Sequence, residues 1–99
     1  MHVEHIELEK GTAEGFRIDL PKAPLLLIRA GSGFVMCGYL NIQSANKLGV
    51  LAARVTGVKT FDELMNAPVV EISNEAKALG ITEGMLGREA LEKMFDYLE

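Results

Sequence analysis

The sequence has no tryptophan, one cysteine and two histidines, and its basic residues are scattered along the chain. A single cysteine cannot form an internal disulfide, which agrees with a reducing compartment. Because there is no Cys or His cluster, we predict no structural zinc, no other metal site and no cofactor. Ten Lys and Arg residues stand against fourteen Asp and Glu, so no concentrated positive face is expected for binding a nucleic acid.

Long apolar runs are also absent. The longest unbroken aliphatic stretch covers residues 25–28, far short of the roughly 20 residues that span a bilayer. We therefore predict no membrane segment. The chain begins Met1-His2-Val3-Glu4-His5, with acidic residues where a signal peptide carries positive charge. A cytoplasmic protein is the expectation.

The composition is that of a folded globular protein. The hydrophobic fraction is 48% and the charged fraction 24% over 99 residues, which fits one domain. A chain of this size buries only about 60–70% of its unfolded surface, so a partner that covers more would add stability. We predict one domain over residues 1–99, with an N-terminal β-hairpin in residues 1–20 and an α+β core in residues 21–99.

Four strands are predicted in the first 39 residues. Residues 3–10 and 16–20 are predicted to be strands joined by a glycine-containing turn, so residues 2–20 form an antiparallel hairpin. Residues 25–30 are apolar on both faces, as in a central strand. A turn at 31–33 leads into an apolar strand at 34–39. An isolated hairpin is marginally stable, so the N-terminal one must pack on the domain or on another copy.

Two helices are predicted in the middle of the chain. Asn41 is a helix-capping residue, and apolar residues then recur at three- and four-residue spacing, which predicts an amphipathic helix from residue 42 to about residue 54. Thr60 and Glu63 have the spacing of a capping box, which opens a short helix ending near Asn66.

The last third of the chain is predicted to hold one strand and two helices. Residues 69–72 form a short strand, and Ser73 caps a helix of about two turns that Gly80 ends, with Ile81 packing back as in a Schellman motif. Residues 88–98 are predicted to form an amphipathic helix. The whole pattern indicates an α+β fold with a mainly antiparallel sheet packed against a few short amphipathic helices.

The junction between the strand at 34–39 and the following helix is the first candidate site. Cys37 lies just before a helix N-terminus, where free N–H groups and the helix dipole can favour a thiolate nucleophile. Gly38 would let a ligand approach closely, Asn41 offers an amide, and Tyr39, two residues on and on the same strand face, could orient a ligand. A lone cysteine in an apolar strand is more often a buried core residue, which is the preferred interpretation.

A base for such a nucleophile is missing from the pattern. The two histidines, His2 and His5, lie near the terminus and three residues apart, so on a strand they face opposite sides and cannot hold one metal together. Residues 84–88 could cradle an anion with backbone N–H groups and the Arg88 guanidinium. Because Met and Leu lie between the glycines, a packing turn that ends at Gly87 is the better interpretation.

Several short motifs occur together over nearly the whole chain. They are residues 25–28, 35–42, 57–61, 67–70, 80–81, 84–85 and 87–91. In this combination the chain resembles the YunC-like family, domain of unknown function 1805, of bacteria and archaea. Leu86 is a departure, since a small hydroxyl residue is expected before Gly87. The resemblance implies an α+β domain whose N-terminal β region mediates tetramer formation, and it implies no established activity.

Two functional hypotheses follow. The first is a non-enzymatic homo-oligomer, a tetramer formed through residues 2–20, that binds an unknown small ligand or another protein, because no complete acid, base and nucleophile set is visible. The alternative is a thiol-dependent enzyme or a redox-sensitive site at Cys37. Candidate ligand-binding residues are Gly38, Tyr39, Asn41, Gly87 and Arg88.

Overall fold

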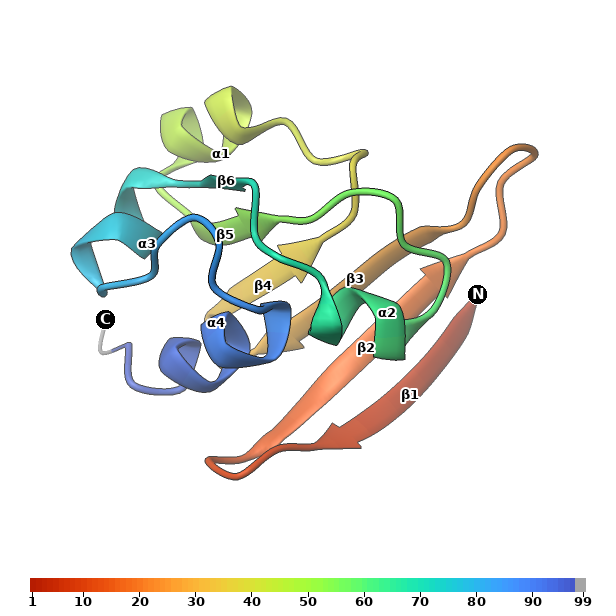
Figure 1. Cartoon of the computed structure of the whole chain (residues 1–99), viewed down its shortest axis with the longest axis horizontal. Coiled ribbons are helices and arrows are strands. Elements are labelled where there is room, and N and C mark those ends of the chain that lie inside the picture. Colours follow the sequence, from red (N-terminus) through yellow and green to blue (C-terminus); the bar gives the residue numbers. More distant parts are fainter. Residues whose placement is uncertain (98–99) are drawn as a thin grey trace.

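The strands form one six-stranded sheet whose spatial order follows the sequence (Figure 1). The structure is a computed structural model and describes residues 1–97. The strands are β1 (His2–Glu7), β2 (Thr12–Ile18), β3 (Leu25–Ala30), β4 (Gly33–Met36), β5 (Leu51–Arg54) and β6 (Glu71–Ile72). All neighbours pair antiparallel except β4 and β5, which are parallel. The predicted α+β fold with a mainly antiparallel sheet is confirmed.

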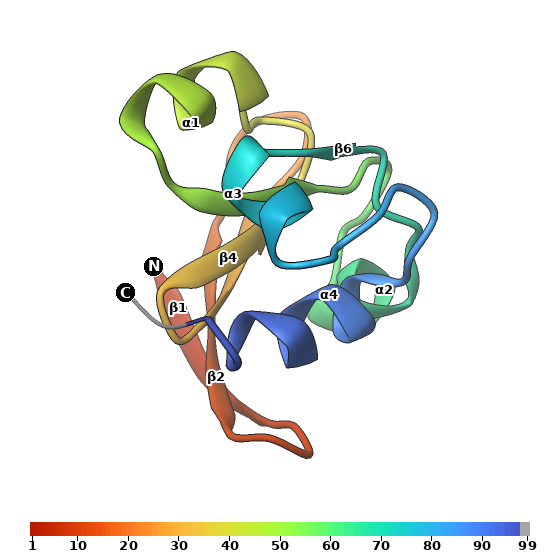
Figure 2. The same cartoon turned by 90° about the vertical axis from the view of Figure 1, so that its left-hand side faces the viewer.

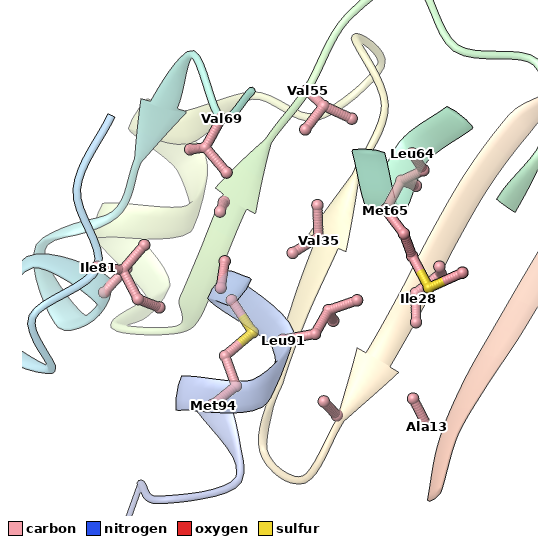
Figure 3. Close-up of a cluster of buried hydrophobic side chains, with 14 of the residues drawn as sticks. Ala13, Ile28, Val35, Val55, Leu64, Met65, Val69, Ile81, Leu91 and Met94 are labelled. Carbon is pink, nitrogen blue, oxygen red and sulfur yellow. The ribbon is translucent and has the colours of Figure 1, made fainter. Parts of the chain in front are cut away.

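Four helices pack on this sheet. They are α1 (Ile42–Leu48), α2 (Phe61–Asn66), α3 (Asn74–Ala78) and α4 (Gly87–Met94). Figure 2 shows α2 and α4 together on one side of the strands and α1 apart from them. The core lies between the sheet and the helices, where Ile28 and Val35 of the sheet face Leu91 and Met94 of α4 (Figure 3). No helix within residues 1–97 is long and apolar enough to cross a bilayer.

The predicted helix over residues 42–54 is wrong in its second half. Helix α1 ends at Leu48, and Gly49 takes a left-handed conformation with φ of 71°, which favours glycine and closes a helix. The chain then enters β5, where Ala52 and Ala53 are both fully buried. In the sequence, the small side chains at 52 and 53 continue the spacing of an amphipathic helix. In the structure, their small size lets neighbouring elements pack closely against both faces of β5.

Several strand boundaries also differ from prediction. Strand β4 ends at Met36 rather than at residue 39, so Tyr39 lies in a turn and not on the same strand face as Cys37. Strand β2 begins at Thr12 rather than at residue 16, so the first hairpin turn lies closer to the N-terminus than predicted. The last helix spans 87–94 instead of 88–98, and residue 98 lies outside the described residues. The predicted boundaries are inaccurate because single residues determine where a turn begins, whereas the spacing of apolar residues indicates only the type of element.

The predicted helix caps are confirmed. The Thr60 hydroxyl accepts a hydrogen bond at the start of α2, and the Ser73 hydroxyl accepts one from the Ala76 N–H at 3.3 Å. At the end of α3, Gly80 has φ of 94°. The Ile81 N–H donates to the Ala76 carbonyl at 3.0 Å, which is the bonding of a Schellman motif.

One face of the sheet packs against α2 and α4, and the other, hereafter the outer face, is largely open. Cross-strand pairing aligns Val3, Phe16, Leu27 and Met36 in a single apolar row on the outer face. Val3 is 46% exposed and Ile18 is 40% exposed. A face with this much apolar side chain is typical of an interaction surface.

The N-terminal hairpin packs on the rest of the chain through its inner face. Ala13 is fully buried, and Gly15 lies so close to Phe61 that a Cβ there would come within 2.9 Å of the ring. The Glu92 carboxylate on α4 accepts hydrogen bonds from the backbone of the hairpin turn, including the Lys10 N–H at 3.0 Å. The inner face of the hairpin is therefore packed against the rest of the chain, whereas its outer face is exposed.

Candidate functional site

Three chain segments line a solvent-open cavity of about 300 Å³ at one end of the sheet. This junction cavity is lined by residues 23–24, which precede β3, residues 37–39, which follow β4, and residues 57–59, which follow β5. Because β4 and β5 are parallel and β3 runs opposite to both, the ends of β4 and β5 meet the start of β3 at the same edge. The lining is mainly apolar.

Cys37 forms one wall of the junction cavity and is only 4% exposed. Its sulfur accepts a hydrogen bond from the Leu26 N–H at 3.4 Å and is 4.0 Å from the Pro24 carbonyl oxygen, to which the thiol donates. Both polar functions of the thiol are therefore directed at the backbone around the start of β3. This arrangement agrees with the preferred interpretation of Cys37 as a core residue.

Tyr39 and Gly38 form the next part of the lining, in the turn after β4. The Tyr39 hydroxyl donates to the Ala23 carbonyl at 3.2 Å, although the residue is 51% exposed. This bond ties the turn after β4 to the turn before β3 across the cavity. A Cβ on Gly38 would meet nothing closer than 3.9 Å, so this glycine leaves space beside the lining.

Lys59 is the one charged residue among the lining residues that the structure describes, and the sequence interpretation missed it. Its backbone N–H donates to the Glu63 carboxylate at 2.7 Å, and its carbonyl accepts from the Arg17 guanidinium at 3.4 Å. Within residues 1–97 its ammonium group makes no ion pair. The only sequence signal for Lys59 is its place just before the capping box, which says nothing about a cavity.

No histidine, aspartate or glutamate lines the junction cavity as the structure describes it. His2 pairs with Arg17 on β2 and its ring stacks on Phe61 with centroids 6.4 Å apart, whereas His5 pairs with Glu14. The two histidines thus lie on opposite faces of β1, and neither reaches Cys37. Over the described part of the chain, no three His, Cys, Asp or Glu side chains gather as metal ligands would.

The remaining sequence candidates lie outside the junction cavity. Asn41 caps α1, its side-chain oxygen accepting the Ser44 N–H at 3.1 Å. Gly87 is packed against α2, where a Cβ would come within 2.3 Å of the Leu64 carbonyl oxygen. Arg88 donates to the Asn66 side chain at 3.2 Å. The structure thus brings together Cys37, Gly38 and Tyr39 but not Gly87 or Arg88.

A second hollow lies on the outer face beside α1. This α1 groove has a volume of about 410 Å³, and its apolar lining includes Leu25, Phe34 and Met36 of the sheet and Leu48 of α1. Leu48 is 78% exposed. Tyr39 lines both the groove and the junction cavity, so the two sites share one side chain.

Comparison with known proteins identifies the family of the chain. Residues 36–94 match the family model described as a domain of unknown function, DUF1805. The chain is 40% identical over 81 residues to the uncharacterized protein YunC of Bacillus subtilis (strain 168), covering 78% of this chain and 80% of that protein. It is also similar to the crystal structure of TA1206, a protein of unknown function from Thermoplasma acidophilum, with a TM-score of 0.89 and 43% identity over 93% of this chain and 90% of that one. The chain therefore belongs to the DUF1805 family, the YunC-like family that its sequence motifs indicate.

Proposed function

We propose that the protein is a homotetrameric, non-enzymatic binding module that holds a small ligand in the junction cavity. The observation that carries the binding role is the cavity itself: a hollow of about 300 Å³ with apolar walls and one cation. Small-molecule sites are typically concave, apolar and about 300–1,000 Å³ in volume, with a few polar groups that orient the ligand. No His, Asp or Glu is among the lining residues described here, and the Cys37 thiol and the Tyr39 hydroxyl are bonded to the backbone, which favours binding over catalysis.

The binding role is tested by filling the cavity. Titration of ¹⁵N-labelled protein with a mixed set of small apolar compounds at millimolar concentration should shift the amide signals of residues 37–39 and 57–59. Ala23→Phe enlarges a lining residue and should abolish these shifts, whereas Lys22→Phe, at the exposed neighbouring position, should leave them intact. Absence of shifts at these residues in the wild-type protein would contradict the proposal.

The tetramer is supported by two surfaces on the N-terminal strands. The outer face carries the apolar row that runs from Val3 to Met36. Within residues 1–97, strand β1 pairs only with β2, so its other edge has backbone groups that no described strand pairs. A dihedral tetramer needs two distinct self-complementary interfaces, and the face and the edge provide one each. A protein of this size gains stability by covering both.

Assembly is tested by placing a charge on the outer face. Light scattering after size-exclusion chromatography should give a tetramer for the wild-type protein at micromolar concentration. Ile18→Lys should dissociate it, because the ammonium would be buried in an apolar interface. Ile18 is 40% exposed in the single chain, so the fold should tolerate the change. Thr82→Lys, on an exposed loop away from the outer face, is the matched control.

A monomeric wild-type protein, or a tetramer unaffected by Ile18→Lys, would contradict the assembly proposal. Deletion of residues 1–20 is a weaker test. It removes Ala13 from the core and leaves β3 without its partner β2, so loss of assembly could reflect loss of the fold.

The second candidate function is a thiol-dependent or redox-sensitive site, favoured by the position of Cys37 in the wall of the junction cavity. An activated thiolate would react with iodoacetamide at pH 6 almost as fast as at pH 8. A thiol that titrates like free cysteine would react roughly a hundredfold more slowly at pH 6. Because Cys37 is 4% exposed and bonded to backbone, we expect slow alkylation. Fast reaction at pH 6 would favour the enzyme instead.

A further inference from the structure

We infer that the ligand of the junction cavity is a small apolar carboxylate, with its hydrocarbon body against Pro24 and Val58 and its carboxylate at Lys59. This inference rests on the proposed binding function and adds the chemical class of the ligand. It depends on the walls of the cavity, on the unpaired Lys59 ammonium, and on the state of the neighbouring charges.

The interior of the cavity is suited to a hydrocarbon. Its walls include the side chains of Pro24 and Val58 and the ring of Tyr39. Cys37 is the polarizable group among them, but its sulfur is engaged by the Leu26 N–H and the Pro24 carbonyl. The Tyr39 hydroxyl is likewise engaged by the Ala23 carbonyl. Few hydrogen-bonding groups on the side chains of the wall are therefore free. Polar groups on the part of the ligand that lies against this wall would lose their hydration without gaining new hydrogen bonds.

Lys59 sets the charge of the ligand's polar end. It is the lining residue that carries a charge, and its ammonium makes no ion pair with any residue in the range 1–97. The ammonium of a residue that lines an apolar hollow attracts an anion and repels a cation. A carboxylate on an apolar body fits both the apolar walls of the cavity and the positive charge of Lys59.

Two carboxylates, Glu63 beside Lys59 in the chain and Glu71 beside Arg54, are bonded to other groups. The Glu63 carboxylate accepts the Lys59 backbone N–H at 2.7 Å. Glu71 accepts from the Arg54 side chain at 2.7 Å, and the Arg54 guanidinium lies 3.9 Å from a Cβ built on Gly38. Neither acid forms an ion pair with the Lys59 ammonium: Glu63 is bonded to a backbone N–H, and Glu71 is paired with Arg54.

Backbone donors beside the cavity complete the site. The N–H groups of Gly38 and Val58 make no hydrogen bond to any other residue that the structure describes. Both residues line the cavity. Free backbone N–H groups near a cation are suited to a carboxylate, which only accepts hydrogen bonds.

Three compounds with the same six-carbon body separate charge from shape: hexanoate, 1-hexanol and hexylammonium. Each is titrated into ¹⁵N-labelled full-length protein at pH 7 and low salt, and affinity is taken from the shifts of residues 37–39 and 57–59. Hexanoate should bind about fivefold more tightly than 1-hexanol, the size expected for one partly exposed charge pair. Hexylammonium should bind most weakly. Added salt should reduce the preference for hexanoate.

Two variants assign the preference to one side chain. Lys59→Met keeps the length of the side chain and should weaken hexanoate binding about fivefold while leaving 1-hexanol binding unchanged. Lys22→Met removes an exposed charge outside the cavity and should leave both affinities unchanged.

Equal binding of hexanoate and 1-hexanol, or full hexanoate affinity in Lys59→Met, would overturn the carboxylate assignment while the binding function stands. If none of the three compounds shifts residues 37–39 and 57–59, the binding function itself fails, and the ligand class with it. Shifts confined to the outer face would have the same meaning, because they would report binding elsewhere.

Discussion

Ser73 is the residue whose replacement should destabilise the fold most informatively. It is a polar side chain with no exposed surface, between β6 and α3. Its hydroxyl oxygen accepts the Ala52 N–H of β5 at 3.0 Å and the Ala76 N–H in the first turn of α3 at 3.3 Å. One oxygen atom therefore bonds a backbone N–H of β5 and also caps α3. Ser73→Ala removes both hydrogen bonds.

The magnitude follows from these two bonds. Loss of an N-cap costs about 1 kcal/mol. A buried N–H without a partner costs about 1–3 kcal/mol, and Ala52 is fully buried. Together they predict that Ser73→Ala lowers the free energy of unfolding by about 2–4 kcal/mol, a large share of the roughly 5–15 kcal/mol that typical domains have.

Urea unfolding followed by circular dichroism would measure this loss, at one fixed protein concentration because assembly also contributes to stability. Thr60→Ala is the matched control. Thr60 caps α2 through a single bond to the Glu63 N–H at 3.1 Å in an exposed position, so its loss should cost only about 1 kcal/mol. If Ser73→Ala costs no more than Thr60→Ala, the buried bond to β5 contributes nothing and the reasoning is refuted.

The same unfolding measurement checks three further predictions. Gly87→Ala should cost about 1–3 kcal/mol or more, because its Cβ would lie 2.3 Å from the Leu64 carbonyl oxygen. Gly38→Ala should change stability by less than about 0.5 kcal/mol, since its nearest neighbours would be 3.9 Å away, and a larger loss would show that this contact reasoning is wrong. Cys37→Ala should cost about 1–2 kcal/mol as a buried truncation, whereas an unchanged stability would argue against the sulfur packing into the core.

The sequence predicted the fold class, most elements and the helix caps because these depend on local patterns. The Ser73 and Gly80 signals lie within a few residues of the structure they determine, and both are confirmed. Strand β5 was missed because Ala52 and Ala53 carry no β-branched signal and continue the spacing of α1. The left-handed Gly49 ends α1 two residues before β5 begins, and a glycine inside a helical pattern is ambiguous in sequence alone.

That missed strand explains why the candidate site was found only in part. The junction after β4 was visible because Cys37 and Gly38 lie just before the helix that Asn41 caps. Lys59 was not, because it enters the site only when β5 lies parallel to β4 and carries residues 57–59 to the same edge. Lys59 is 22 positions away from Cys37, and no local sequence pattern indicates that the two residues line the same cavity.

The chemistry of Cys37 also depends on a contact between distant strands. The pairing of β3 with β4 extends one step past Met36, where the Cys37 N–H donates to the Leu26 carbonyl at 3.1 Å. This places the sulfur against the Leu26 N–H and the Pro24 carbonyl. The contact that makes Cys37 a wall of the junction cavity thus also occupies its donor and acceptor functions. A nucleophile needs its sulfur free toward the ligand, so the geometry favours binding at this junction over thiol chemistry.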